Sequence, residues 1–183
     1  MVQSKESIKV LDLVYVSIGA ALIAICSWIN IPTVIPFTLQ TFAVFLVLCL
    51  FGGERGTIAT LVYVLLGAVG VPVFAGFAGG LGVLLGNTGG YIFGFILMGI
   101  IYIFLTRIFG NKNAVKITAL VIGLIACYAF GTAWFMYVYM KNTGEVGLLT
   151  VLTWCVFHFI NPDIVKMELA VAIAKRVEPV INK

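Results

Sequence analysis

The chain has 183 residues, of which 62% are hydrophobic and only 10% charged, and its mean hydropathy is +1.18. Soluble domains are about 45–50% apolar, so this composition excludes an ordinary soluble protein and indicates an all-α integral membrane protein. The net charge of +4 comes from basic residues at the ends of apolar segments, which membrane topology explains, so no nucleic-acid partner is predicted.

Six apolar segments approach the length that a bilayer requires. We predict one membrane domain over 1–183, a compact bundle with transmembrane helices at about residues 10–29, 36–51, 57–70, 91–107, 117–140 and 162–177. An apolar segment at 148–160 is too short to span, and we interpret it as a re-entrant or interfacial helix on the outer side, just before the last span.

The first span follows a short polar tail at residues 1–9 and carries small residues at helical spacing. Its long apolar stretch has no clean small-x-small site at its end, so a cleavable signal peptide is not predicted. Ala20 and Ala24 form a small-xxx-small pair, which lets another helix approach closely. The pair fits either packing inside the bundle or docking to a partner membrane protein.

The second span follows an uncharged, proline-containing break at 28–36 and begins in the sequence at Pro36. Gln40 and Thr41 are polar groups about one turn into this apolar helix. Their side chains could bond a neighbouring helix or a ligand, and the sequence does not decide between the two. A short charged turn at 52–56 then leads into the third span.

An uncharged, glycine-rich loop at 71–90 joins the third and fourth spans. It is too apolar for a solvated linker, so we predict a packed lid and wall over a cavity. The phosphate-binding spacing G-x-x-x-x-G-K-[ST] is absent, and no other ATPase motif occurs in the chain. Any ATP hydrolysis that accompanies this protein would therefore belong to another subunit. No cofactor or metal site is predicted.

Basic residues give the predicted topology. In a six-span arrangement all the lysines and arginines except Lys141 and Lys166 fall on one side. The positive-inside rule then places both termini in the cytoplasm. The break at 28–36, the glycine-rich loop and the start of the last span fall on the outer side, where they can converge on one pocket open to the exterior.

The last span begins with the most charged stretch in the apolar part of the chain. Pro162 suits the first turn of a helix, with Asn161 as its N-cap. Asp163 and Lys166, at i and i+3, then share one face. Charges at membrane depth usually face a bundle interior or a cavity, so this pair either binds a small, partly apolar solute with a carboxylate and N–H groups or only closes the helix end. Glu168 points away from that face, and only pairing with another helix accounts for it.

Several motifs, in this order and over nearly the whole chain, resemble the biotin-specific S component (BioY family) of the energy-coupling factor (ECF) transporters. The matching pieces are Pro36-Phe37-Thr38-Leu39-Gln40-Thr41, Gly70-Val71-Pro72-Val73-Phe74-Ala75-Gly76, Gly79-Gly80-Leu81-Gly82-Val83-Leu84-Leu85-Gly86, Thr88-Gly89-Gly90-Tyr91 and Pro162-Asp163-x-x-Lys166. The sequence departs from the family pattern at Ala78, at Asn87, where proline is common, and at Glu168.

The resemblance implies a multi-pass protein of a bacterial or archaeal cytoplasmic membrane that captures biotin from outside. It also implies delivery through a transmembrane coupling protein and two ATP-binding-cassette ATPases. The implied or candidate ligand residues are Asp163, Lys166, Tyr91, Gly79, Gly80, Gln40 and Asn87. The family meets its coupling protein through small residues of the first span, which favours docking at Ala20 and Ala24. Whether Lys166 contacts the ureido oxygen, the valerate carboxylate or Asp163 stays open.

Two alternatives remain beside this interpretation. An S component for a different vitamin would share the fold and the partners. A structural membrane protein would use Asp163 and Lys166 only to fix helix packing. A membrane-embedded enzyme is not predicted, because the lone His158 and the scattered cysteines form no nucleophile–base or paired-carboxylate spacing.

Overall fold

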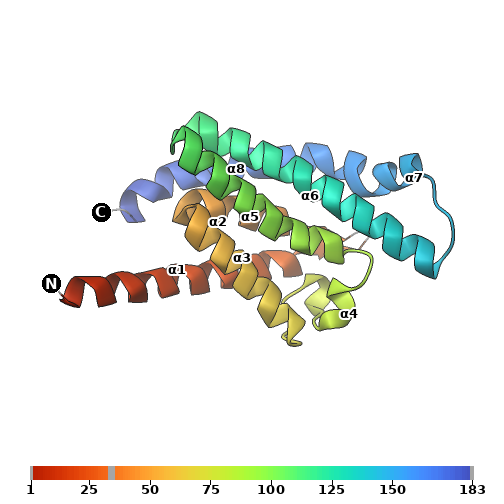
Figure 1. Ribbon diagram of the computed structural model, residues 1–183, viewed down its shortest axis with the longest axis horizontal. Coiled ribbons are helices and arrows are strands. Elements are labelled where there is room, and N and C mark those ends of the chain that lie inside the picture. Colours follow the sequence, from red (N-terminus) through yellow and green to blue (C-terminus); the bar gives the residue numbers. More distant parts are fainter. Residues whose placement is uncertain (1, 33–35, 182–183) are drawn as a thin grey trace.

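The computed structural model describes residues 2–32 and 36–181, and side chains over 10–32 and 36–180. Within these ranges the chain is almost entirely helical, with one small antiparallel hairpin (Figure 1). The elements are α1 (Val2–Trp28), β1 (Asn30–Ile31), β2 (Phe37–Thr38), α2 (Gln40–Phe51), α3 (Gly53–Ala68), η1 (Ala75–Phe77), α4 (Leu81–Leu84), α5 (Gly89–Phe109), α6 (Asn113–Asn142), α7 (Leu148–Leu152), η2 (Thr153–Phe157) and α8 (His158–Ile181).

Four helical segments of the described chain are long and apolar enough to cross a membrane: Val10–Trp28, Gly89–Phe109, Asn113–Asn142 and Leu148–Val180. α2 and α3 have 12 and 16 residues, fewer than the roughly 20 of a typical span. The fold is therefore that of a helical membrane protein, while the count of six spans stays a prediction.

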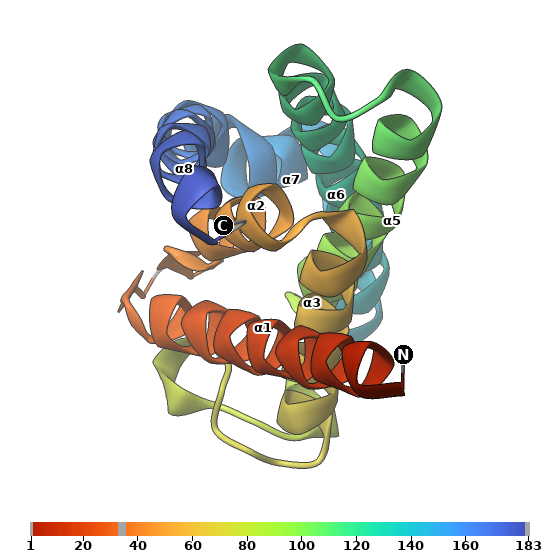
Figure 2. The ribbon, with the colours of Figure 1, turned by 90° about the vertical axis from the view of Figure 1, so that its left-hand side faces the viewer.

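The bundle has two ends. α1 begins and α8 ends at the same end of the bundle, and the glycine-rich segment and α7 lie toward the other end (Figure 1). α2 lies in the middle, in contact with α1, α3, α5 and α8 (Figure 2). Its residues Ala43 to Cys49 are all buried, so α2 forms the centre of the hydrophobic core.

α5 and α6 pack against each other along their length, and glycines set how closely they approach. A Cβ atom on Gly94 would lie 2.6 Å from Cys127 Sγ, and one on Gly123 would lie 2.6 Å from Met98. Small residues at such crossings are the usual means by which membrane helices bring their backbones together. This close pair fixes the position of the α6 side chains that face α8.

Several helix starts differ from the predicted ones. α1 already begins at Val2, within the stretch that we expected to be a polar tail. α2 begins at Gln40 rather than Pro36, because Phe37 and Thr38 pair with Ile31 and Asn30 in the hairpin. Part of the predicted break, residues 33–35, lies outside the described residues. The predicted charged turn at 52–56 is mostly the first turn of α3, which starts at Gly53.

The start of the last helix needs a correction. α7, the π-helical turn η2 and α8 follow one another without a break, so Pro162 lies inside α8 and Asn161 is not its N-cap. Pro162 has no N–H for the carbonyl four residues earlier, and that carbonyl belongs to the residue directly after the π-helical turn. A widened turn is a known way to accommodate such an irregularity in a helix. The segment 148–160 is therefore the first part of one long helical run and not a separate helix.

The glycine-rich segment packs on the bundle through Phe74, which is 1% exposed. A Cβ atom on Gly67 would lie 2.0 Å from the Phe74 ring, so only glycine leaves room for that ring on α3. Two side chains near the end of α1 anchor the segment: Trp28 Nε1 donates to the Pro72 carbonyl at 2.9 Å, and Ser27 Oγ donates to that of Val73. Other apolar side chains of the segment stay exposed, namely Phe77, Leu81 and Leu85.

Candidate ligand-binding site

An ion pair on α8 is the most polar feature of the buried interior. Asp163 and Lys166 are 1% and 7% exposed, and Lys166 Nζ lies 2.8 Å from Asp163 Oδ1. Their i, i+3 spacing places both on the α8 face that packs against α2. Two buried charges require hydrogen-bond partners for the donors and acceptors that the ion pair itself leaves unused.

Those partners come from the start of α2 and the hairpin before it. Thr41 Oγ1 donates to Asp163 Oδ1 at 2.8 Å. Lys166 Nζ donates to the Thr38 carbonyl at 2.8 Å and lies 3.1 Å from Thr41 Oγ1. The ammonium also lies 4.2 Å from the centre of the Phe37 ring, within cation–π range. The hairpin thus holds the lysine, and the first turn of α2 holds both charges.

The second carboxylate oxygen is held from α6, because Tyr128 OH donates to Asp163 Oδ2 at 2.6 Å. Both oxygens of Asp163 are therefore paired, one with Lys166 and Thr41 and the other with Tyr128. A ligand that binds Asp163 must add to these bonds or replace one of them. Tyr128 was not among the predicted site residues.

A cavity of about 130 Å³ adjoins the pair. Known small-molecule pockets have volumes of about 300–1,000 Å³, so this one is small for a ligand site. It lies between the hairpin, the glycine-rich segment and helices α2, α5, α6 and α8. Its lining residues are Pro36, Thr38, Gln40, Thr41, Phe74, Ala75, Val83, Thr88, Tyr91, Ile92, Phe95, Leu124, Cys127, Tyr128, Cys155, Phe159, Asp163 and Lys166.

Four of the predicted ligand residues line this cavity: Asp163, Lys166, Tyr91 and Gln40. Gln40 Nε2 donates to Tyr63 OH at 2.8 Å, so its amide is already bonded to α3. Tyr91 OH and Thr132 Oγ1 are 3.1 Å apart, and either hydroxyl can donate. The structure thus brings together predicted residues that are far apart in the sequence.

Gly79, Gly80 and Asn87 are not among the lining residues. A Cβ atom on Gly79 would lie 2.5 Å from the Val71 carbonyl oxygen, so a side chain there would push the loop open. Gly80 has a positive φ of 92° and donates its N–H to the Gly67 carbonyl at 2.7 Å. In this structure the two glycines hold the loop against α3, which is a backbone role and not a side-chain contact with the cavity.

Ala20 and Ala24, the predicted docking pair, are 3% and 7% exposed. Both face the interior, where α1 packs on α2 and α3. Of the two roles that the sequence left open, packing inside the bundle is the one that this geometry fits. Among the α1 residues whose side chains are described, 10–28, the small residues that remain exposed are Ser17 and Ala21.

The cysteines and acids do not form a metal centre. No group of three His, Cys, Asp or Glu side chains is placed to hold a metal ion within the described residues. Cys127 and Cys155 line the cavity as buried, free thiols. What the site presents chemically is one ammonium, one carboxylate, two phenols, a primary amide, three threonine hydroxyls, two thiols and apolar walls.

Fold and site together define a helical membrane protein with a small, mainly apolar cavity beside a buried ion pair. The model of the BioY family matches residues 2–183, and the chain belongs to the BioY family. It is 40% identical over 156 residues to the biotin transporter BioY of Thermotoga maritima, covering 85% of this chain and 79% of that protein. It is 38% identical over 145 residues to the probable biotin transporter BioY of Pyrococcus horikoshii, covering 79% and 81%.

A solved structure shares the fold over nearly the whole chain. The crystal structure of the S-component for biotin from an ECF-type ABC transporter is similar with a TM-score of 0.82 and 26% sequence identity. The match covers 94% of this chain and 93% of that one. The protein is therefore membrane-embedded, and its relatives are transporters rather than enzymes.

Proposed function

We propose that this chain is the substrate-binding membrane subunit of an ECF-type importer and captures biotin from the exterior for ATP-driven uptake. The observation that carries the proposal is the buried Asp163–Lys166 pair beside a cavity, in a fold similar to that of the biotin S-component. Membership of the BioY family and relatives named as biotin transporters support the choice of ligand.

In this proposal Asp163 accepts hydrogen bonds from the ureido N–H groups of biotin. Lys166 donates to the ureido oxygen or to the valerate carboxylate, since its ammonium carries donors only. Thr41 and Tyr128 hold the Asp163 carboxylate in a fixed orientation. Tyr91 and Gln40 contribute to the wall. Gly79, Gly80 and Asn87 act through the loop that covers the cavity.

Binding is proposed to enlarge the cavity, because about 130 Å³ is small for a bicyclic ligand with a side chain. The parts that can move with least loss of core packing are the hairpin and the glycine-rich segment, whose Phe77, Leu81 and Leu85 are exposed.

The proposed setting is the cytoplasmic membrane of a bacterium or archaeon, with six spans and both termini in the cytoplasm. The charge distribution supports this orientation, as does the fact that α1 begins and α8 ends at the same end of the bundle (Figure 1). Because no ATPase motif occurs in the chain, the proposed partners are a transmembrane coupling protein and two ABC-type ATPases. Ser17 and Ala21, exposed and four residues apart on α1, fit the docking role better than Ala20 and Ala24.

The test is isothermal titration of the purified protein with biotin, with thiamine and riboflavin as controls. We expect tight one-to-one binding of biotin alone, and a loss of at least roughly tenfold in Asp163→Asn, because a buried charge-assisted hydrogen bond is worth about 1.5–3 kcal/mol. Binding of another vitamin would keep the fold and the partners but reject biotin. If a folded sample bound none of the three, the structural interpretation of the ion pair would replace the proposal.

A further inference from the structure

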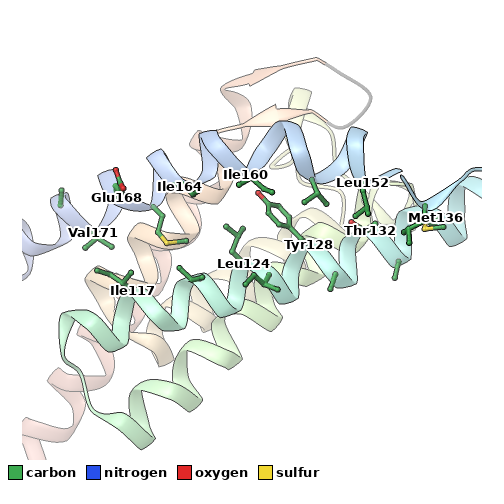
Figure 3. A pocket seen from close by; sticks show the side chains of 18 of the residues that line it. Ile117, Leu124, Tyr128, Thr132, Met136, Leu152, Ile160, Ile164, Glu168 and Val171 are labelled. Atoms are coloured by element: carbon green, nitrogen blue, oxygen red, sulfur yellow. The ribbon is translucent and has the colours of Figure 1, made fainter. Parts of the chain in front are cut away.

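A second hollow lies on the other side of α8, between α8 and α6 (Figure 3). It is an open groove of about 1,270 Å³, several times larger than the cavity at the ion pair. Its walls are almost entirely apolar, with Ile117, Leu124 and Met136 on α6 facing Val171 and Ile164 on α8 and Leu152 on α7 (Figure 3). The described chain places nothing in it.

Charged residues line the groove mainly at one end. Lys175 and Arg176, near the end of α8, are exposed, and neither forms an ion pair within the described part of the chain. Lys116 lies close to Lys175 but is buried, and its ammonium is paired with Glu178 at 2.9 Å. The end of the groove therefore carries two basic groups whose charge is available to a bound molecule.

The dimensions match a lipid of one leaflet. From Lys175 back to Ile164 is eleven residues of α8, or about 16 Å at 1.5 Å per residue. That is about half of the roughly 30 Å hydrocarbon core. A molecule with its anionic head at Lys175 and an acyl chain along Val171 would reach Ile164 and Leu124. The groove continues beyond this point to Met136, over the depth of the other leaflet.

We propose that this groove binds one anionic phospholipid of the leaflet at which α8 ends, with its phosphate at Lys175 and Arg176 and an acyl chain between α6 and α8. Basic pockets between transmembrane helices are known to select anionic head groups. Glu168 lies seven residues before Lys175, about 10 Å deeper along the helix. Its carboxylate keeps the phosphate at the level of the two basic residues and disfavours an anion farther in.

Native mass spectrometry of the full chain tests this, with phosphatidylglycerol, phosphatidylethanolamine and phosphatidylcholine titrated separately onto delipidated protein. We expect one phosphatidylglycerol to bind in preference to both zwitterionic lipids. Lys175→Gln with Arg176→Gln should reduce that affinity by roughly fivefold for each basic residue removed. The matched control, Lys112→Gln with Lys141→Gln, removes the same charge at exposed positions outside the groove and should keep the preference.

Ala172→Trp tests the apolar half of the site, because Ala172 lines the groove between Glu168 and Arg176 while every charge stays in place. We expect it to lower binding of phosphatidylglycerol, and Glu168→Gln to leave it unchanged or stronger. If the double glutamine variant does not fold, Arg176→Gln alone must lower the preference about fivefold.

Several results would overturn the proposal. These are equal binding of all three lipids, equal losses in the groove and control variants, an unchanged preference in Arg176→Gln, or an Ala172→Trp variant that binds phosphatidylglycerol like the parent chain. Masses of two chains that Ala172→Trp abolishes would assign the groove to a second copy of this protein. The inference does not depend on the vitamin that the protein binds.

Discussion

The two hollows beside α8 differ in what they enclose. On one side Asp163 and Lys166 are buried, and their charged atoms are bonded to α2, α6 and the hairpin. On the other side Ile164 and Glu168 are exposed in an open groove. Leu124 and Tyr128 line both hollows and form the wall between them. One helix can carry both a polar site and an apolar outer surface because successive residues of an α-helix point about 100° apart around its axis.

We expect the largest loss of stability when one of the two buried charges, Asp163 or Lys166, is removed. Lys166→Met removes the ammonium and leaves Asp163 buried without its counter-charge, which should lower the free energy of unfolding by roughly 3 kcal/mol or more. Thermal unfolding in detergent measures this. Glu168→Gln removes a charge from the groove side of the same helix and should change stability by less than about 0.5 kcal/mol.

The double variant Asp163→Asn with Lys166→Met separates stability from ligand binding. A buried ion pair can often be replaced by uncharged residues at little cost, so the double variant should be more stable than Lys166→Met alone. Biotin binding should nevertheless remain lost, since both charged groups of the proposed site are gone. Recovery of biotin binding together with stability would show that the pair serves only helix packing.

The next effect concerns the wall between the two hollows. Tyr128→Phe keeps the ring but leaves Asp163 Oδ2 without its hydrogen bond from α6. We expect the free energy of unfolding to fall by about 1.5–3 kcal/mol and biotin affinity to fall by at least roughly tenfold in titration, since about 1.4 kcal/mol corresponds to tenfold. The control is Tyr137→Phe on the same helix, whose side chain is exposed. Equal biotin affinity in the two variants would mean that Tyr128 lines the cavity but that its hydrogen bond to Asp163 does not contribute to binding.

Tighter packing between α5 and α6 should also disturb the cavity, because Tyr91 of α5 lines it. A Cβ atom on Gly131 would lie 2.3 Å from the Tyr91 ring. Gly131→Ala should therefore displace Tyr91 and destabilise the protein by about 1–2 kcal/mol, as overpacked cores do, with weaker biotin binding. Gly82→Ala, where nothing lies within 4 Å of the added Cβ atom, is the control and should leave both measurements nearly unchanged.

The sequence predicted the central pair of the site because the relation between Asp163 and Lys166 is local. A spacing of i and i+3 places two side chains on one helix face whether the helix begins at Pro162 or, as it does, at His158. Thr41 was recognised as a polar group in an apolar helix, but its bond to Asp163 depends on a contact across 122 residues. Tyr128 was not predicted as a site residue, and only the packing of α6 shows that it bonds Asp163.

The helix α1 shows why the burial of individual residues could not be predicted from the sequence. Lipid is as apolar as a protein core, so the exposed Leu13 and Ile18 look in the sequence like the buried Ile23. Hydrophobicity therefore does not tell which small residues face inward, and Ala20 and Ala24 are buried while Ser17 and Ala21 are exposed. The π-helical turn before Pro162 was equally unpredictable, because a proline inside a helix and a proline at its start have the same local sequence.

The smallest effect is expected at the membrane surface, where an ion pair is not enclosed. Arg107 and Glu54 form a pair between α5 and α3, and their side chains are 69% and 67% exposed. Arg107→Gln should cost less than about 1 kcal/mol, because exposed pairs gain little in a high dielectric and are screened by salt. Lys116→Met should cost clearly more, because Lys116 is buried and pairs with the partly exposed Glu178. Thermal unfolding at low and high salt compares them: salt should weaken the contribution of Arg107 and leave that of Lys116 nearly constant. Equal losses of stability at the two pairs would mean that burial does not determine how much an ion pair contributes in this protein. The reason for expecting a large effect at Lys166 would then no longer hold.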